Sequence, residues 1–413
     1  MDYSKANVLV VGSGIDCVHA ERISRDVAKT YYWTPCMTGF PKFKEFAKGH
    51  GLGHGEKVIK MFDYVDRSDL IYFTDIGFGD IADFLRKRGH NVFGAGRGEA
   101  LELERFKSRN IQHRLGLPTQ HTVQIKGITK LRKYLEKNEN VYVKLDTWRG
   151  DIESFFSKSA DDVDLLLDEI ESAFGPLKEE QDFIVEDQVE NGIVEYGFDG
   201  IFNGTKFLQP YLFGIEHKAP YLGHFRNDMP KSLQNTMDKL TPLFKALDYR
   251  GMFADEEILV DEDTSYLIDA TCRPSFPLST IYTELFKNYT EVIFKTAEGK
   301  DVDIDVEAPF CGCLPLNSQH AGENWLKLNI TKGYENRIKP VYGCQIDGKL
   351  YAVKGFTTVA CLIAWGNSLD DVVGQLKDLT KEIDAYELEK ETSDLDEIQK
   401  DIETLKKAVG IEF

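Results

Sequence analysis

The sequence predicts a mixed fold, with a doubly wound α/β domain at the N-terminus followed by α+β lobes. The first apolar run, residues 7–11, ends at a glycine turn and precedes a helical stretch, as expected for a buried parallel strand that leads into a helix. Short strand-like runs then alternate with helical stretches. After residue 190, strand-like runs follow one another with few helices between them, which indicates an antiparallel region.

The N-terminal α/β domain is predicted to span residues 1–105. After the helical stretch at 17–29, apolar runs at 70–74 and 91–93 indicate two further strands of the same sheet. Helical patterns at 81–88 and 99–115 lie beside these strands. This alternation of strand and helix is typical of a parallel sheet covered on both faces.

Residues 106–190 are predicted to form a smaller α+β lobe. Its expected elements are strands at 121–124, 141–145 and 183–187 and helices at 129–138 and 160–174.

Residues 191–305 are predicted to form a larger, mainly antiparallel lobe. Its expected elements are strands at 192–199, 206–213, 253–261 and 266–273 and helices at 231–248 and 279–296.

A terminal α+β domain is predicted for residues 306–413. Strand patterns occur at 338–342, 349–353 and 359–364. The charged helical stretch at 369–409 is expected to cover one side of the sheet with a solvated outer face.

Composition excludes several classes of function. The 413 residues carry a formal charge of −19, which repels nucleic acid and anionic membranes. No run of 18 apolar residues occurs, and the N-terminus lacks the pattern of a secretory signal. Seven cysteines, of which only Cys311 and Cys313 are closely spaced, suit a reducing compartment and buried thiols rather than a zinc site. We therefore expect a soluble cytoplasmic protein, monomeric or homodimeric, without nucleic-acid or membrane partners.

The two acidic strands at 253–261 and 266–273 contain the strongest candidate for a metal site. Strict alternation places Glu257 near Asp269 on the neighbouring strand, with Thr271 and Arg273 on the same face as Asp269. Oxygen ligands suit Mg²⁺, and an arginine can hold a phosphate or a carboxylate through two hydrogen bonds. An exposed hairpin with charged outward positions explains the same pattern and remains an alternative.

Three basic residues are candidates for phosphate binding. Lys144 lies in an otherwise apolar strand, and a buried ammonium needs an anionic partner. Lys107 is a second candidate, although an isolated helix lysine is commonly solvated. Arg149 lies in the following loop, which could close on phosphates if Asp151 and Glu153 do not repel them.

Asp75 and Gly77 follow the strand at 70–74, where ligands enter an open α/β sheet. Asp75 and the nearby Asp80 could equally cap the next helix.

The order of these features resembles the ATP-grasp superfamily and, over nearly the whole chain, its phosphoribosylamine-glycine ligase family. Each motif is short, and the resemblance depends on their shared order. The matching segments are residues 8–14, 19–20, 93–94, 103–107, 116–119, 143–144, 184–186, 216–218, 249–251, 268–273 and 362–366.

The resemblance implies an ATP-grasp fold with an N-terminal pre-ATP-grasp domain, and a role for each matching residue. ATP would contact Lys107, Lys144, Arg149, Glu186, Asp187, Val189 and Glu195. Mg²⁺ or Mn²⁺ would be held by Glu257, Asp269 and Thr271, the last in place of the family's asparagine. Lys218 would lie near the transferred phosphate and Arg273 near the acyl substrate. The amine substrate would contact Gly14, Asp16, His19, Asp75 and Gly77.

The substrate loops differ from the family pattern. The amine-binding loop, residues 14–19, has one extra residue and no arginine, and the family's glycine-proline-glutamate segment is replaced at 74–77. Both differences remove contacts expected for a phosphoribosylamine. The resemblance therefore implies an ATP-dependent carboxylate-amine ligase with an acyl-phosphate intermediate and an altered small-molecule acceptor. An authentic phosphoribosylamine-glycine ligase and a non-catalytic nucleotide-binding protein remain alternatives.

Overall fold

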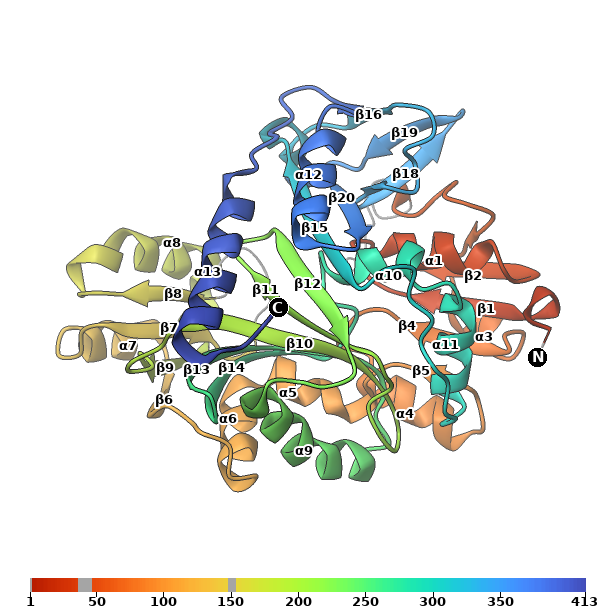
Figure 1. Ribbon diagram of the computed structural model, residues 1–413. Coiled ribbons are helices and arrows are strands. Elements are labelled where there is room, and N and C mark those ends of the chain that lie inside the picture. The colour runs from red at the N-terminus through yellow and green to blue at the C-terminus, as the bar shows by residue number, and fades with distance from the viewer. Residues whose placement is uncertain (1, 36–46, 148–153) are drawn as a thin grey trace.

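The computed structural model describes residues 2–35, 47–147 and 154–413 (Figure 1). These residues form a parallel sheet at the N-terminal end, a small antiparallel sheet, a long antiparallel sheet through the middle of the molecule, and a second small antiparallel sheet near the C-terminus. The predicted combination of α/β and α+β architecture is confirmed.

The N-terminal sheet has the strand order β3-β2-β1-β4-β5 and is parallel throughout. Its strands are β1 (Asn7–Val11), β2 (Lys29–Trp33), β3 (Glu56–Lys57), β4 (Leu70–Phe73) and β5 (Val92–Phe93). The helices are α1 (Cys17–Ser24), α3 (Phe62–Val65), α4 (Gly79–Lys87) and α5 (Ala100–Leu103). Strand β2 was not predicted. Its first residue, Lys29, was assigned to the end of the helical stretch 17–29, so the short aromatic run after it was not identified as a strand.

Helices cover both faces of this sheet. Leu9 and Val11 of β1 pack with residues of α3 and α4, whereas Val8 and Val10 pack with α1 and with α11 (Tyr289–Ala297). Helix α11 lies more than 200 residues further along the chain. The N-terminal sheet is therefore buried against a later part of the chain.

The small lobe contains a four-stranded antiparallel sheet of order β6-β9-β7-β8. Its elements are β6 (Thr122–Lys126), α7 (Ile128–Leu135), β7 (Val141–Leu145), β8 (Ser154–Ser157), α8 (Asp164–Phe174) and β9 (Asp182–Asp187). Helix α6 (Arg105–Arg114) precedes this lobe and is separated from α5 at Glu104, where one continuous helix was predicted.

The long sheet has the order β14-β13-β10-β11-β12-β15-β20-β17. Its strands are β10 (Val194–Asn203), β11 (Tyr211–Glu216), β12 (Tyr221–Arg226), β13 (Arg250–Asp261), β14 (Thr264–Thr271), β15 (Phe310–Asn317), β17 (Ile338–Pro340) and β20 (Thr358–Gly366). Helices α9 (Lys231–Ala246) and α10 (Ser279–Leu285) belong to the same region. Because β12 pairs with β15, the sheet runs without interruption across the predicted domain boundary at 305/306.

The second small sheet consists of β18 (Gly343–Ile346), β19 (Lys349–Ala352), β16 (Leu326–Ile330) and β21 (Ile383–Asp384). The helical stretch predicted for 369–409 is instead two helices, α12 (Leu369–Leu379) and α13 (Ser393–Val409), because β21 pairs with β16 between them. Helix α13 contacts β10, β11 and β12 in the middle of the molecule (Figure 1). Among the helices of the described residues, none has both the length and the apolar character that a membrane span requires.

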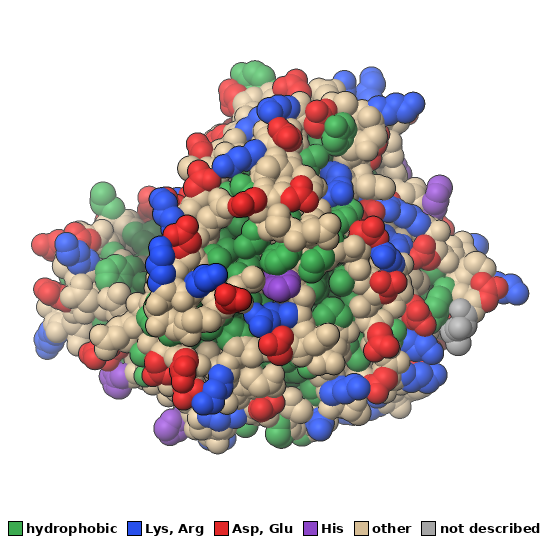
Figure 2. All heavy atoms as spheres, viewed as in Figure 1, with side chains coloured by type: hydrophobic (Ala, Val, Ile, Leu, Met, Phe, Trp, Pro, Cys, Tyr) green, Lys and Arg blue, Asp and Glu red, His purple; other side chains and the backbone are tan. Residues whose placement is uncertain are grey.

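Acidic and basic side chains are interspersed over the face shown in Figure 2. The net negative charge is thus spread over this face rather than gathered in one acidic patch.

Candidate active site

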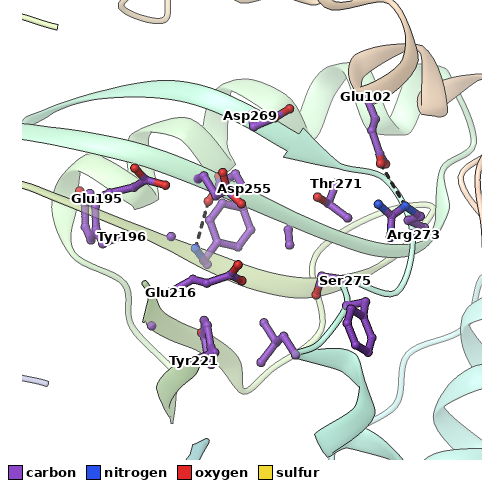
Figure 3. A pocket seen from close by; sticks show the side chains of 17 residues that line it. Glu102, Glu195, Tyr196, Glu216, Tyr221, Asp255, Asp269, Thr271, Arg273 and Ser275 are labelled. Atoms are coloured by element: carbon purple, nitrogen blue, oxygen red, sulfur yellow. Dashed lines mark hydrogen bonds and ion pairs between the residues drawn. The ribbon is translucent and has the colours of Figure 1, made fainter. Parts of the chain in front are cut away.

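Two adjoining cavities lie where the small lobe meets the long sheet, each with a volume of about 200 Å³. The first lies over β10, β11, β13 and β14 and reaches Arg273 and Ser275 (Figure 3). The second extends towards β7 and β9. Both cavities are lined by Glu195, Glu256 and Asp269, so they share a wall, and we treat them together as one candidate site.

Lys144 lies on the wall of the second cavity. Its Nζ donates a hydrogen bond to the carbonyl of Ile268 at 2.9 Å and lies 3.7 Å from a carboxylate oxygen of Glu186. The residue is only 7% exposed, as the apolar strand around it predicted. The protein therefore supplies one anionic partner, and the ammonium still faces the cavity. Asp187 and Val189 line the same cavity.

Sequence reasoning missed two arginines on α6. Arg109 is buried and donates to both carboxylate oxygens of Glu186, and Arg105 lies 3.8 Å from Asp269. Burial by itself would raise the pKa of Glu186, but the charges of Arg109 and Lys144 lower it below the ordinary value. The sequence did contain a signal for this pair. Arg105 and Arg109 are four residues apart, which places both side chains on one face of a helix.

Lys107 points elsewhere. Its side chain is exposed and pairs with Glu104 at 2.8 Å, and it lines neither cavity. Arg105 and Arg109, rather than Lys107, are the basic residues of α6 that contact residues lining the cavities, namely Asp269 and Glu186.

The first cavity has an acidic wall. Burial, followed by the charges of Glu256 and Glu195, raises the pKa of Glu216 well above its ordinary value. Burial also raises the pKa of Glu195, with a further contribution from Asp269 that the charge of Lys144 opposes. Figure 3 shows Glu195 and Glu216 reaching from β10 and β11 towards the space below Asp269 and Thr271. A cation in this cavity would relieve the mutual repulsion.

The structure corrects the predicted position of Glu257. A β-bulge between Glu256 and Glu257 shifts the register, so that Glu256 lies opposite Asp269 and Glu257 opposite Leu267. Glu257 is completely buried and accepts a hydrogen bond from the hydroxyl of Ser265. Glu256 therefore takes the place beside Asp269 that strict alternation assigned to Glu257. Within the described ranges, no group of three or more His, Cys, Asp or Glu side chains is arranged to hold a metal by itself.

Thr271 is the last residue of β14, and Arg273 lies in the loop that follows. Both line the first cavity. Arg273 donates from Nε to Glu102 at 3.0 Å and lies 3.7 Å from Asp75. These carboxylates hold the guanidinium at the cavity wall, with Glu102 reaching it from α5. Glu102 was not identified from the sequence.

Of the residues predicted to contact an amine substrate, Asp75 lies 3.7 Å from Arg273 of the first cavity, and the charge of Asp16 also acts on this guanidinium. Gly14 and Gly77 have positive φ angles of 110° and 87°, which glycine adopts easily. Asp16 is buried, and neither carboxylate oxygen has a hydrogen-bond partner among the described residues. Burial, with a contribution from the charge of Asp75, raises the pKa of Asp16 to about 7.

His19, which was predicted to contact the amine substrate, lies in the packed interior beside α10 and α11. It is completely buried, with Nδ1 bonded to the hydroxyl of Tyr289 and Nε2 lying 3.2 Å from the Ser279 hydroxyl. Burial lowers the pKa of His19 to about 3.

We expect this histidine to make the protein less stable in mild acid. The unfolded chain binds a proton at a pKa of about 6.5 while folded His19 stays neutral, so the unfolding free energy should fall by up to about 1.4 kcal/mol per pH unit below that value. Urea unfolding at several pH values measures the slope. His19→Gln should flatten it and His54→Gln, at an exposed position, should not. An unchanged slope in His19→Gln would assign the acid sensitivity to other groups.

Lys218 lies outside both cavities. It is in the turn between β11 and β12, is largely exposed, and pairs with Asp394 of α13 at 2.9 Å. The structure therefore gives Lys218 a contact with the C-terminal helix where a contact with phosphate was predicted. Arg149 lies outside the described residues.

No protein-family model matches the sequence, and a comparison with curated proteins finds no match. Solved structures do match. A phosphoribosylamine-glycine ligase from Thermotoga maritima aligns with a TM-score of 0.70 at 15% identity, over 92% of this chain and 98% of the other.

Two other enzymes give similar alignments. The biotin carboxylase domain of 2-oxoglutarate carboxylase from Hydrogenobacter thermophilus, solved with MgADP and bicarbonate, aligns with a TM-score of 0.66 at 12% identity, over 93% of this chain and 91% of that one. N5-carboxyaminoimidazole ribonucleotide synthetase from Thermus thermophilus aligns at 0.60 and 14% identity, over 91% and 98%. This agreement over nearly the full length of each chain shows that the protein has the ATP-grasp fold.

Proposed function

We propose that this protein is an ATP-dependent carboxylate-amine ligase that activates its carboxylate substrate as an acyl phosphate. The observation that carries the proposal is the wall that the two adjoining cavities share. One contains the ammonium of Lys144, the other the guanidinium of Arg273, and Glu195, Glu256 and Asp269 line both. A nucleotide in the second cavity could thus direct its terminal phosphate towards a carboxylate held near Arg273.

The chemistry of the lining residues fits Mg-ATP. The described lining of the first cavity includes a surplus of carboxyl groups, and its guanidinium, Arg273, is already bonded to Glu102. An anionic phosphate would be repelled there unless a cation bound first. Glu256 and Asp269 supply oxygen ligands on adjacent strands, and Mg²⁺ commonly completes its coordination with phosphate oxygens and water. This arrangement agrees with the absence of a preformed three-residue metal site among the described residues.

The side chains would serve mainly to position the reactants and to neutralise charge. Lys144 would neutralise phosphate charge, and Arg273 would orient the carboxylate. Attack of the carboxylate oxygen on the terminal phosphorus would release ADP. An amine would then form the new C–N bond while phosphate leaves.

The test is ADP release with Mg-ATP and a matrix of carboxylates and amines, including glycine with phosphoribosylamine, and bicarbonate. A carboxylate labelled with ¹⁸O provides the decisive readout, because an acyl phosphate transfers one labelled oxygen to the released phosphate. We expect ADP release that depends on both substrates, together with ¹⁸O in phosphate. Binding of ATP without turnover by any pair would favour a non-catalytic nucleotide-binding protein. ADP formation without ¹⁸O transfer would exclude the acyl phosphate.

A further inference from the structure

A serine on the wall of the first cavity is bonded to a buried carboxyl group that the proposed phosphate chemistry does not use. The Ser275 hydroxyl donates to Oδ2 of Asp199 at 2.6 Å. Figure 3 shows Ser275 at the cavity beyond Thr271 and near the loop that carries Arg273. Asp199 lies on β10 and is 2% exposed. The hydroxyl of Tyr282 also lies close enough to this carboxyl group to interact with it.

No described cation lies within ion-pair distance of Asp199, although several neutral groups surround it. The titratable groups that sense its charge are Tyr72 of β4, Tyr221 of β12, Tyr249 just before β13, Tyr282 of α10 and Cys311 of β15. Burial raises the pKa of each, so all five remain neutral near pH 7.

Burial also raises the pKa of Asp199, to about 7, although the hydroxyls of Ser275 and Tyr282 oppose the shift. A buried carboxylate without a cation costs stability, which makes a purely structural role for this group hard to explain. A proton acceptor works best when its pKa lies near the working pH.

We propose that Ser275 and Asp199 together accept the proton of the amine that attacks the activated carboxyl group. This inference rests on the proposed ligase function and adds to it the route of the amine proton. Ser275 would touch the amine, whereas Asp199 acts through Ser275 and is a positioning residue. Ser275 lines the same cavity as Arg273, so an acyl group held by Arg273 would be within the cavity that Ser275 faces, with Asp199 buried behind the serine.

The amine nitrogen forms a bond to the carbonyl carbon, and the bond from that carbon to the phosphate oxygen breaks, so phosphate leaves with the electron pair. A proton passes from nitrogen to Oγ of Ser275 as the serine's own proton passes to Oδ2 of Asp199. Asp199 becomes a neutral acid. The proton later returns through Ser275 to water in the cavity.

Infrared titration tests the pair without requiring turnover. We expect a carboxylic acid C=O band that titrates between pH 6 and 8, disappears in Asp199→Asn and persists in Asp16→Asn, the other buried carboxyl with a pKa of about 7. Ser275→Ala should raise the midpoint, because the serine hydroxyl stabilises the charged form. Absence of any band in this range that depends on Asp199 or Ser275 would overturn the proposal, and the serine variant keeps the test valid if Asp199→Asn does not fold.

Kinetics separates proton transfer from phosphoryl transfer. With a substrate pair that supports turnover, Asp199→Asn and Ser275→Ala should each lower amine transfer about 100-fold and remove the acidic limb of the kcat profile near pH 7. Hydroxylamine, which attacks acyl phosphates without base assistance, should still form hydroxamate within about threefold of the wild-type rate, and Ser275→Thr should recover amine transfer. If the variants lose amine transfer and hydroxamate formation equally, or lose neither, the proposed role of Ser275 and Asp199 is wrong, whereas the proposed ligase function stands. A wild-type protein without ADP release would instead overturn the ligase itself.

Discussion

Replacing Asp269 with Asn is expected to lower ADP release at least about 100-fold, because the change removes a charged ligand from the proposed magnesium site. Asp269 lines both cavities and lies opposite Glu256 across the β13–β14 pair. Glu256→Gln should have a similar effect. In both variants, raising the Mg²⁺ concentration should recover part of the activity if the lost charge acts through the metal.

Glu257→Gln is the matched control for this prediction. The neighbouring glutamate has the same chemistry but is buried against Ser265, outside both cavities, so its variant should retain turnover within a few-fold. Steady-state ADP release over a series of Mg²⁺ concentrations distinguishes the three variants. Loss of activity in Glu257→Gln with full activity in Glu256→Gln would show that the bulge does not select the functional carboxylate.

Replacing Arg109 with Met is expected to cause a large loss of stability, about 3–5 kcal/mol. Arg109 and Glu186 are both buried and share two hydrogen bonds, and the substitution leaves Glu186 with Lys144 as its remaining cationic contact among the described residues. The double variant Arg109→Met/Glu186→Leu should be more stable than the single one, because the buried carboxylate that lost its arginine is also removed, and Lys144 keeps its hydrogen bond to the carbonyl of Ile268.

Urea unfolding near neutral pH measures this effect, and its pH dependence gives a second check. The pKa of Glu186 is lowered in the folded protein, so the pair contributes stability above the unfolded pKa of about 4.5 and loses it as pH falls through the lower folded value. The difference between wild type and Arg109→Met should therefore shrink in acid. Single and double variants of equal stability would indicate that the two side chains are not energetically coupled.

Local patterns were sufficient to predict much of the fold. The apolar run Asn7–Val11 and the strand Val141–Leu145 appear with the predicted bounds, because a buried strand requires consecutive apolar residues wherever it lies. The burial of Lys144 followed from the same reasoning. In contrast, β15 (Phe310–Asn317) was missed, because its glycine, cysteines and proline give no clear strand pattern, and pairing with β12 and β20 determines its conformation.

The candidate site depended more strongly on tertiary structure. The sequence by itself determined that acidic strands and a buried lysine would occur, and the order of its motifs indicated the ATP-grasp fold. Only the tertiary structure decided that Glu256 rather than Glu257 lies beside Asp269, because a single bulged residue reverses which side chains face the cavity. It also decided the pairing of Arg109 with Glu186 and of Ser275 with Asp199, since each joins residues 76 or 77 positions apart. Alternation and helical periodicity describe the faces of single elements, whereas contacts between elements arise only when the sheets and helices pack.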